Sequence, residues 1–89
     1  MLYLYRHSPE LTARLSLLEK LVRSGDAVLF IEDGVIAPAT GRAGALKGAE
    51  VYALSEDLLA RGFAETACKC VDMQGFVALT AKHGSPVNL

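Results

Sequence analysis

Residues 27–31 form a continuous apolar run, AVLFI, in which hydrophobic and polar residues do not alternate. Strands that are apolar on both faces are typical of parallel sheets covered by helices on either side. The run stops at Glu32-Asp33-Gly34, which we interpret as a strand-ending turn where Gly34 supplies the special backbone angles. This single feature therefore predicts a parallel sheet between helical layers.

The rest of the chain alternates in the same way. Further strands are predicted at residues 2–5, 51–54 and 68–72, with a short edge strand near residues 86–87. Helices are predicted at residues 9–22, as a short or broken segment within 35–48, at 55–61 and at 76–82. Ser8 and Ser55 are expected to be N-caps and Gly25 a left-handed C-cap. The alternation predicts one domain over residues 1–89, a small three-layer α/β fold of flavodoxin-like type with a mainly parallel sheet.

The composition restricts the classes of function. Hydrophobic residues make up 52% of the 89 positions, so a disordered tail is excluded. The formal net charge of -1 argues against a nucleic-acid or membrane binder, which would be basic. No signal peptide and no apolar run of about 20 residues is found, so a cytoplasmic location is expected. So much apolar material in a small chain suggests burial against another subunit.

Polar residues follow several predicted strands, where sites of parallel sheets collect. They are His7, the Glu32-Asp33 pair, Ser55 with Glu56 and Asp57, and Asp72. Neighbouring residues at a strand end usually point to opposite sides, which favours a turn over an acid–base pair at Glu32-Asp33. The glycines at 41, 44 and 48 lack the spacing of a phosphate-binding loop.

Cys68 and Cys70 are the most reactive-looking residues. Alternation places both sulfurs on one face of a strand, and a central strand would bury them as small apolar side chains. Thiol chemistry and a metal site stay open as alternatives, although a metal would need further ligands. His83 is interpreted first as a cation at a helix C-terminus, with a catalytic role as the alternative.

The motifs resemble the DsrH/TusB family of sulfur-relay proteins, within the DsrE-like group. The matching segments are HSP at residues 7–9, LFIEDGV at 29–35, VYALSEDLLARG at 51–62, VDMQGFV at 71–77 and Lys82-His83. Their order and spacing cover nearly the whole chain. The resemblance implies the DsrE-like fold, no cofactor, and a subunit of a heterohexamer with TusC-like and TusD-like (DsrF-like and DsrE-like) partners.

The resemblance also implies a chemistry, in which a thiolate attacks the outer sulfur of a donor persulfide. In the TusBCD branch the sulfur passes towards 2-thiolation of a tRNA wobble uridine, and in the DsrEFH branch it serves dissimilatory sulfur oxidation. The main carrier cysteine belongs to the TusD-like or DsrE-like partner. Some members of the family carry further cysteines, at positions where this chain has Leu18 and His83.

The leading hypothesis is therefore a structural, non-catalytic subunit of a TusBCD-like relay that does not itself bind nucleic acid or membrane. The alternatives are a DsrEFH-type subunit, and a thiol-active sulfurtransferase that uses Cys68 or Cys70 and forms a homo-oligomer when isolated. Candidate site residues are Cys68, Cys70 and His83; no metal site is expected.

Overall fold

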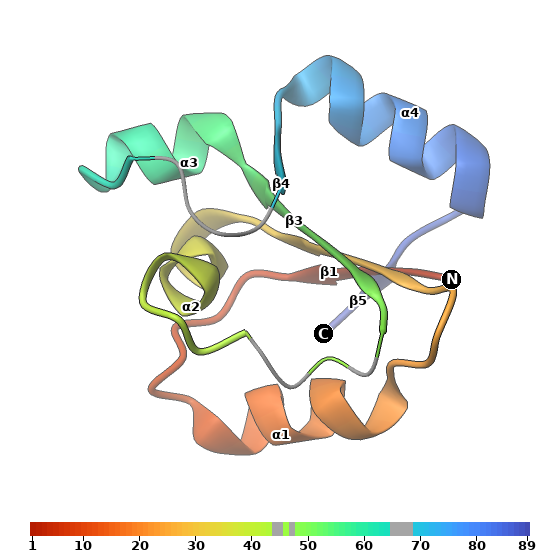
Figure 1. Cartoon of the computed structure of the whole chain (residues 1–89), viewed down its shortest axis with the longest axis horizontal. Helices are drawn as coiled ribbons and strands as arrows, with labels where there is room; N and C mark the ends of the chain where they lie inside the picture. Colours follow the sequence, from red (N-terminus) through yellow and green to blue (C-terminus); the bar gives the residue numbers. More distant parts are fainter. Residues whose placement is uncertain (44–45, 47, 65–68) are drawn as a thin grey trace.

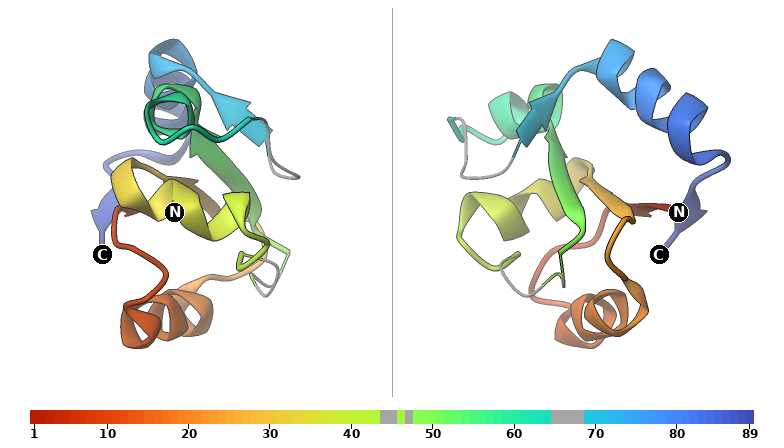
Figure 2. Two further views of the ribbon diagram at one scale, coloured as in Figure 1. Left: turned by 90° about the vertical axis from the view of Figure 1, so that its left-hand side faces the viewer. Right: turned by 45° about the vertical axis from the view of Figure 1, so that its right-hand side comes forward.

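The sheet is the centre of the molecule. A computed structural model describes residues 1–43, 46, 48–64 and 69–89. Its strands are β1 (Leu2–Tyr5), β2 (Ala27–Phe30), β3 (Glu50–Leu54), β4 (Lys69–Val71) and β5 (Val87–Asn88). They form one five-stranded sheet in the order β4-β3-β2-β1-β5, and every pair is parallel. The predicted parallel sheet is thus confirmed, with the expected edge strand beside β1 (Figure 2).

The helices cover both faces of this sheet. They are α1 (Thr12–Leu21), a 3-10 turn η1 (Glu32–Val35), α2 (Ile36–Ala39), α3 (Ser55–Ala60) and α4 (Met73–His83). The chain steps from β1 to β4 in one direction, and right-handed crossovers then place α1, α2 and α3 on one face. The return to β5 runs in the opposite direction and places α4 on the other face. Figure 1 shows α1 and α4 on opposite sides of the strands.

Alternate residues of the strands contribute to two separate cores. Tyr3 and Tyr5 of β1 pack with α1, η1, α2 and α3 in the first core. Leu2 and Leu4 pack with Leu79 of α4 in the second core. All four residues of β2 are buried, as the unbroken apolar run predicted. The sheet therefore gains hydrophobic stabilisation from both faces.

The predicted ends of the first helix are wrong. The Ser8 carbonyl accepts from the Leu11 amide at 3.0 Å and forms a turn, and α1 begins only at Thr12 without a side-chain cap. The helix ends at Leu21 because Val22 adopts an extended backbone, which leaves its side chain 1% exposed in the core. Gly25 does have a positive φ of 92°, but within the turn that leads into β2.

The predicted starts of two other helices need correction, one in its cap and one in its position. Ser55 is the first residue of α3 and makes no capping hydrogen bond. Helix α4 begins at Met73, before the predicted start at Phe76, because Asp72 caps it: its Oδ1 accepts from the Gly75 amide at 2.8 Å. Asp72, one of the polar strand-end residues, thus has a local structural function.

Candidate functional site

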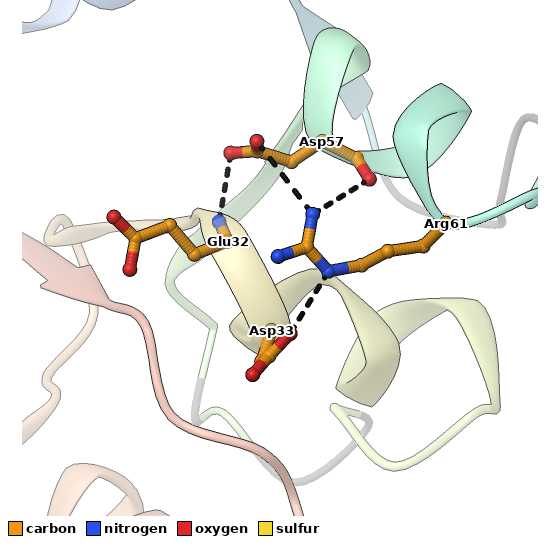
Figure 3. A network of polar contacts seen from close by, with 4 residues as sticks. All are labelled: Glu32, Asp33, Asp57 and Arg61. Atoms are coloured by element: carbon orange, nitrogen blue, oxygen red, sulfur yellow. Dashed lines mark hydrogen bonds and ion pairs between the residues drawn. The ribbon is translucent and has the colours of Figure 1, made fainter.

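A polar network joins η1 to α3 where β2 and β3 end (Figure 3). The Asp57 carboxylate accepts from the backbone amide of Glu32 at 2.7 Å. The Arg61 guanidinium donates through Nε to Asp33 Oδ1 at 3.0 Å and through NH1 to the Asp57 carbonyl at 3.2 Å. The EDG and SEDLLARG motifs therefore meet in space, and their polar side chains hold two elements together.

The two acids of the EDG motif do different things. Asp33 binds Arg61, whereas the Glu32 carboxylate points away from the network (Figure 3). This arrangement agrees with the expectation that the pair does not act jointly on one substrate. Glu32 has a left-handed φ of 51°, and the hydrogen bond that its backbone amide donates to the Asp57 carboxylate holds it in that conformation.

Gly34 is required for a different reason from the one predicted. Its φ is not in the left-handed region; instead, a Cβ at this position would overlap with the backbone carbonyl of Tyr5. The glycine lets η1 pack directly against the end of β1. The special backbone angle that we assigned to Gly34 belongs to Glu32.

Cys70 lies on β4 and faces the first core, half-buried. It borders a partly open pocket of about 150 Å³ whose other described lining residues are Ser55, Leu58, Leu59, Phe63 and Ala64. None of these described residues is charged, so none of them supplies a cation that would stabilise a thiolate. Cys68 lies outside the described residues.

His83 is the last residue of α4, on the opposite side of the sheet from Cys70. Its Nε2 is buried and has no hydrogen-bond partner among the described residues. It does not join Cys70 in a catalytic pair. Within the part of the chain that the structure describes, no three His, Cys, Asp or Glu side chains gather as a metal site.

A second polar group, which the sequence did not reveal, lies at the start of β3 and β4. The Tyr52 hydroxyl donates to Glu50 Oε2 at 2.5 Å, and Lys69 Nζ lies 5.7 Å from the centre of the Tyr52 ring. This hydrogen bond lowers the pKa of Glu50 from its ordinary value, with smaller contributions from Lys69, Lys82 and His83. The same bond raises the pKa of Tyr52. The signal was present in the i, i+2 spacing of Glu50 and Tyr52 on one strand.

The described residues include no helix long and apolar enough to span a membrane. The all-parallel sheet with helices on both faces defines a small three-layer α/β protein, as predicted. A solution NMR structure of protein Tm0979 from Thermotoga maritima has the same fold, with a TM-score of 0.75, 22% sequence identity and coverage of 91% of each chain.

The sequence comparisons identify the family. The model of the family described as "DsrH like protein" matches residues 7–85, so this chain belongs to the DsrH family. Protein TusB of Escherichia coli O81 (strain ED1a) is 40% identical over 92 residues, which cover 96% of both chains. Protein TusB of Photorhabdus laumondii subsp. laumondii is 40% identical over 90 residues, covering 93% of this chain and 94% of the relative. The resemblance seen in the motifs is thus confirmed.

Proposed function

We propose that this chain is the TusB-type subunit of a sulfur relay that leads to 2-thiolation of tRNA wobble uridine. Membership of the DsrH family and the near full-length similarity to proteins named TusB support this function. The relatives named above are both called TusB, which favours the tRNA branch over dissimilatory sulfur oxidation. The proposal includes a cytoplasmic location and one functional domain over residues 1–89.

The proposed role within that relay is structural. The observation that carries it is the surroundings of Cys70, a half-buried thiol in a pocket whose described lining has no charged side chain. Persulfide transfer needs a thiolate, which neighbouring cations favour. The described lining of the Cys70 pocket has no cation, and the helix N-terminus that borders it, at Ser55, belongs to a helix of only 6 residues. Leu18, where some family members carry a cysteine, is fully buried in the first core.

Following the family resemblance, we assign the carrier thiol to a TusD-like partner, with a TusC-like protein as the third subunit of a heterohexamer. The partner's thiolate attacks the outer sulfur of a donor persulfide; a new S–S bond forms, the donor S–S bond breaks, and the donor leaves as a thiolate. This chain would hold the carrier subunit in position.

The test uses the complex assembled from this chain and its TusC-like and TusD-like partners. After incubation with a persulfide donor protein, mass spectrometry locates each added sulfur atom. We expect sulfur on the TusD-like subunit and an unchanged transfer rate in the Cys68→Ser and Cys70→Ser variants. Stoichiometric persulfide on Cys68 or Cys70, or loss of transfer in either variant, would overturn the structural role.

A second candidate function is a thiol-active sulfurtransferase that uses Cys70 and requires no partners. The specific observation in its favour is that the Cys70 pocket is partly open rather than enclosed. Labelling of the native protein with a small alkylating reagent distinguishes the two. The structural role predicts that Cys70 reacts far more slowly than in urea-unfolded chain, whereas the enzyme predicts rapid labelling and persulfide formation by the isolated protein.

A further inference from the structure

Helix α4 exposes an apolar surface to solvent. Met73 is 48% exposed and Val77 is 64% exposed. The other exposed residues on this side of the helix, before Lys82 in its last turn, are Gln74, Ala78 and Ala81. No charged residue occurs from Met73 to Ala81. We call these five residues the α4 strip. Helices that face water normally carry charged residues on their outer side, so this composition is that of a helix covered on both sides.

Helix α1 provides the contrast within the same molecule. It too buries one face, through Leu15 and Leu18. Its outer surface includes Leu17 and Leu21, which are 42% and 40% exposed, but it also carries exposed Arg14 and Lys20 and a half-buried Glu19. Small-domain size therefore does not explain the absence of charge on α4, because α1 of the same chain carries charged residues among its exposed apolar ones.

The α4 strip is also unexplained by the fold of this chain. Several residues of the VDMQGFV motif have local functions: Asp72 caps the helix, and Gly75 allows close approach to Val71. Phe76 packs against the second core. Val77, in contrast, directs most of its side chain into solvent. A valine there gains packing only if another surface covers it.

The neighbouring sheet surface extends the α4 strip. Tyr52 and Val71 belong to the second core but remain half-buried, because α4 is the one described helix on that face. Exposed charges of both signs stand at the borders of this surface: Lys82 at the end of α4, Lys69 at the start of β4, Glu50 near these two lysines, and Asp72 at the start of α4. An apolar centre with a charged border is the usual anatomy of a protein–protein interface.

We propose that the α4 strip, bordered by Lys69 and Lys82, is the surface by which this chain docks onto another subunit of the relay complex. The inference rests on the proposed function and adds the location of the contact. The matching surface is an apolar one whose border carries charges complementary to the lysines and carboxylates named above. In the assembly Met73 and Val77 lose their exposed area, while α1 stays in water.

The size of the strip favours a different subunit over a second copy of this chain. A helix of 11 residues is about 16 Å long and about 10 Å across. One side of the helix therefore offers about 160 Å². That is far less than the roughly 800 Å² that each partner buries in a stable two-chain complex. A two-fold dimer through α4 alone would be weak, whereas a closed assembly supports each small contact with others.

The test measures binding of this chain to its co-expressed TusC-like and TusD-like partners. Val77→Glu places a charge at the centre of the strip, and Leu17→Glu is the matched control, because Leu17 is 42% exposed on α1. We expect Val77→Glu to weaken co-purification at least tenfold and Leu17→Glu to leave it unchanged. Lys82→Glu should weaken it less, with a loss that shrinks at high salt. Circular dichroism and urea unfolding of each isolated variant show whether it folds.

The outcomes separate the two proposals. If the wild-type chain binds the partners and Val77→Glu binds equally well, the docking surface is wrong while the proposed function stands. If Val77→Glu abolishes only self-association of the isolated chain, the occupant is a second copy and the inference is overturned. If the wild-type chain binds neither partner, both the proposed function and the docking surface fail. The inference is supported if Val77→Glu loses partner binding, the control variant keeps it, and the isolated Val77→Glu chain unfolds as the wild type does.

Discussion

The two faces of the sheet differ in the elements that cover them. The first face is covered by α1, α2 and α3, and the Asp57–Arg61 network fixes α3 to η1. On the second face α4 is the one described helix. Both faces leave strand residues half-buried, Val51 and Cys70 on the first and Tyr52 and Val71 on the second. The first face is therefore held by a polar network as well as by apolar packing, whereas the second relies on one described helix that has no charged residue from Met73 to Ala81.

The strongest test of the first face is Gly34→Ala. The added Cβ would overlap with the Tyr5 carbonyl, which is backbone and unable to move aside easily. We expect the free energy of unfolding to fall by about 3 kcal/mol or more, measured by urea denaturation. Gly25→Ala is the control: its φ is 92° with nothing within 4 Å, so it should cost only about 1 kcal/mol. Equal losses in the two variants would show that close packing at η1 is unimportant.

A pair of truncations compares the two faces directly. Leu18→Ala removes a fully buried side chain from the first core and should lower stability by about 3 kcal/mol. Val77→Ala on α4 removes a side chain that is 64% exposed and should change stability by less than about 0.5 kcal/mol. Thermal unfolding of the isolated chain measures both. A Val77 loss as large as that of Leu18 would contradict the distinction between the faces.

The polar network of the first face should contribute a smaller amount. Asp57→Ala removes the acceptor of the Glu32 amide and a partner of Arg61, and we expect a loss of about 1.5 kcal/mol. Asp57→Asn keeps an acceptor oxygen and should lose less. Glu56→Ala, at an exposed neighbouring position in the same helical turn, is the control. If Asp57→Ala and Glu56→Ala unfold at the same urea concentration, the network does not hold α3 to η1.

The smallest expected effect is the pH dependence on the second face. The hydrogen bond from Tyr52 lowers the pKa of Glu50, so this carboxylate stabilises the fold above its unfolded pKa and stops doing so as pH falls through its folded pKa. Glu50→Gln should therefore be slightly less stable than the wild type at neutral pH, with urea midpoints that converge below about pH 4. In a Tyr52→Phe background the neutral-pH difference should shrink, and an undiminished difference would exclude the hydrogen bond as its cause.

Much of the fold followed from local pattern. The strand run at residues 27–31 ends within one residue of β2, and its burial on both sides required helices on both faces. Helix ends were less predictable, because several residue types can start a helix. Ser8 and Ser55 are good N-caps by type, yet Asp72 is the residue whose side chain bonds an amide of the first turn.

The candidate site was less accessible to sequence reasoning because its contacts are distant along the chain. Asp57 binds the Glu32 amide across 25 positions, and Arg61 binds Asp33 across 28. Each motif was visible on its own, but no local signal pairs them. The requirement for Gly34 was equally hidden, since it arises from the approach of Tyr5, a residue of another strand. The cysteine at position 70 was placed on the correct strand, whereas its pocket depends on how α3 folds back over β4.

The position of β5 has a consequence for how the protein is made. Strands β2, β3 and β4 each pair with the strand that precedes them in the chain, so this part of the sheet forms from elements that are near neighbours in sequence. The strand β5 instead pairs with β1, and its register joins Val87 to Tyr3. Helix α4 and β5 leave the ribosome after the other elements, so a truncated chain lacks the α4 surface and is kept out of any assembly that requires it.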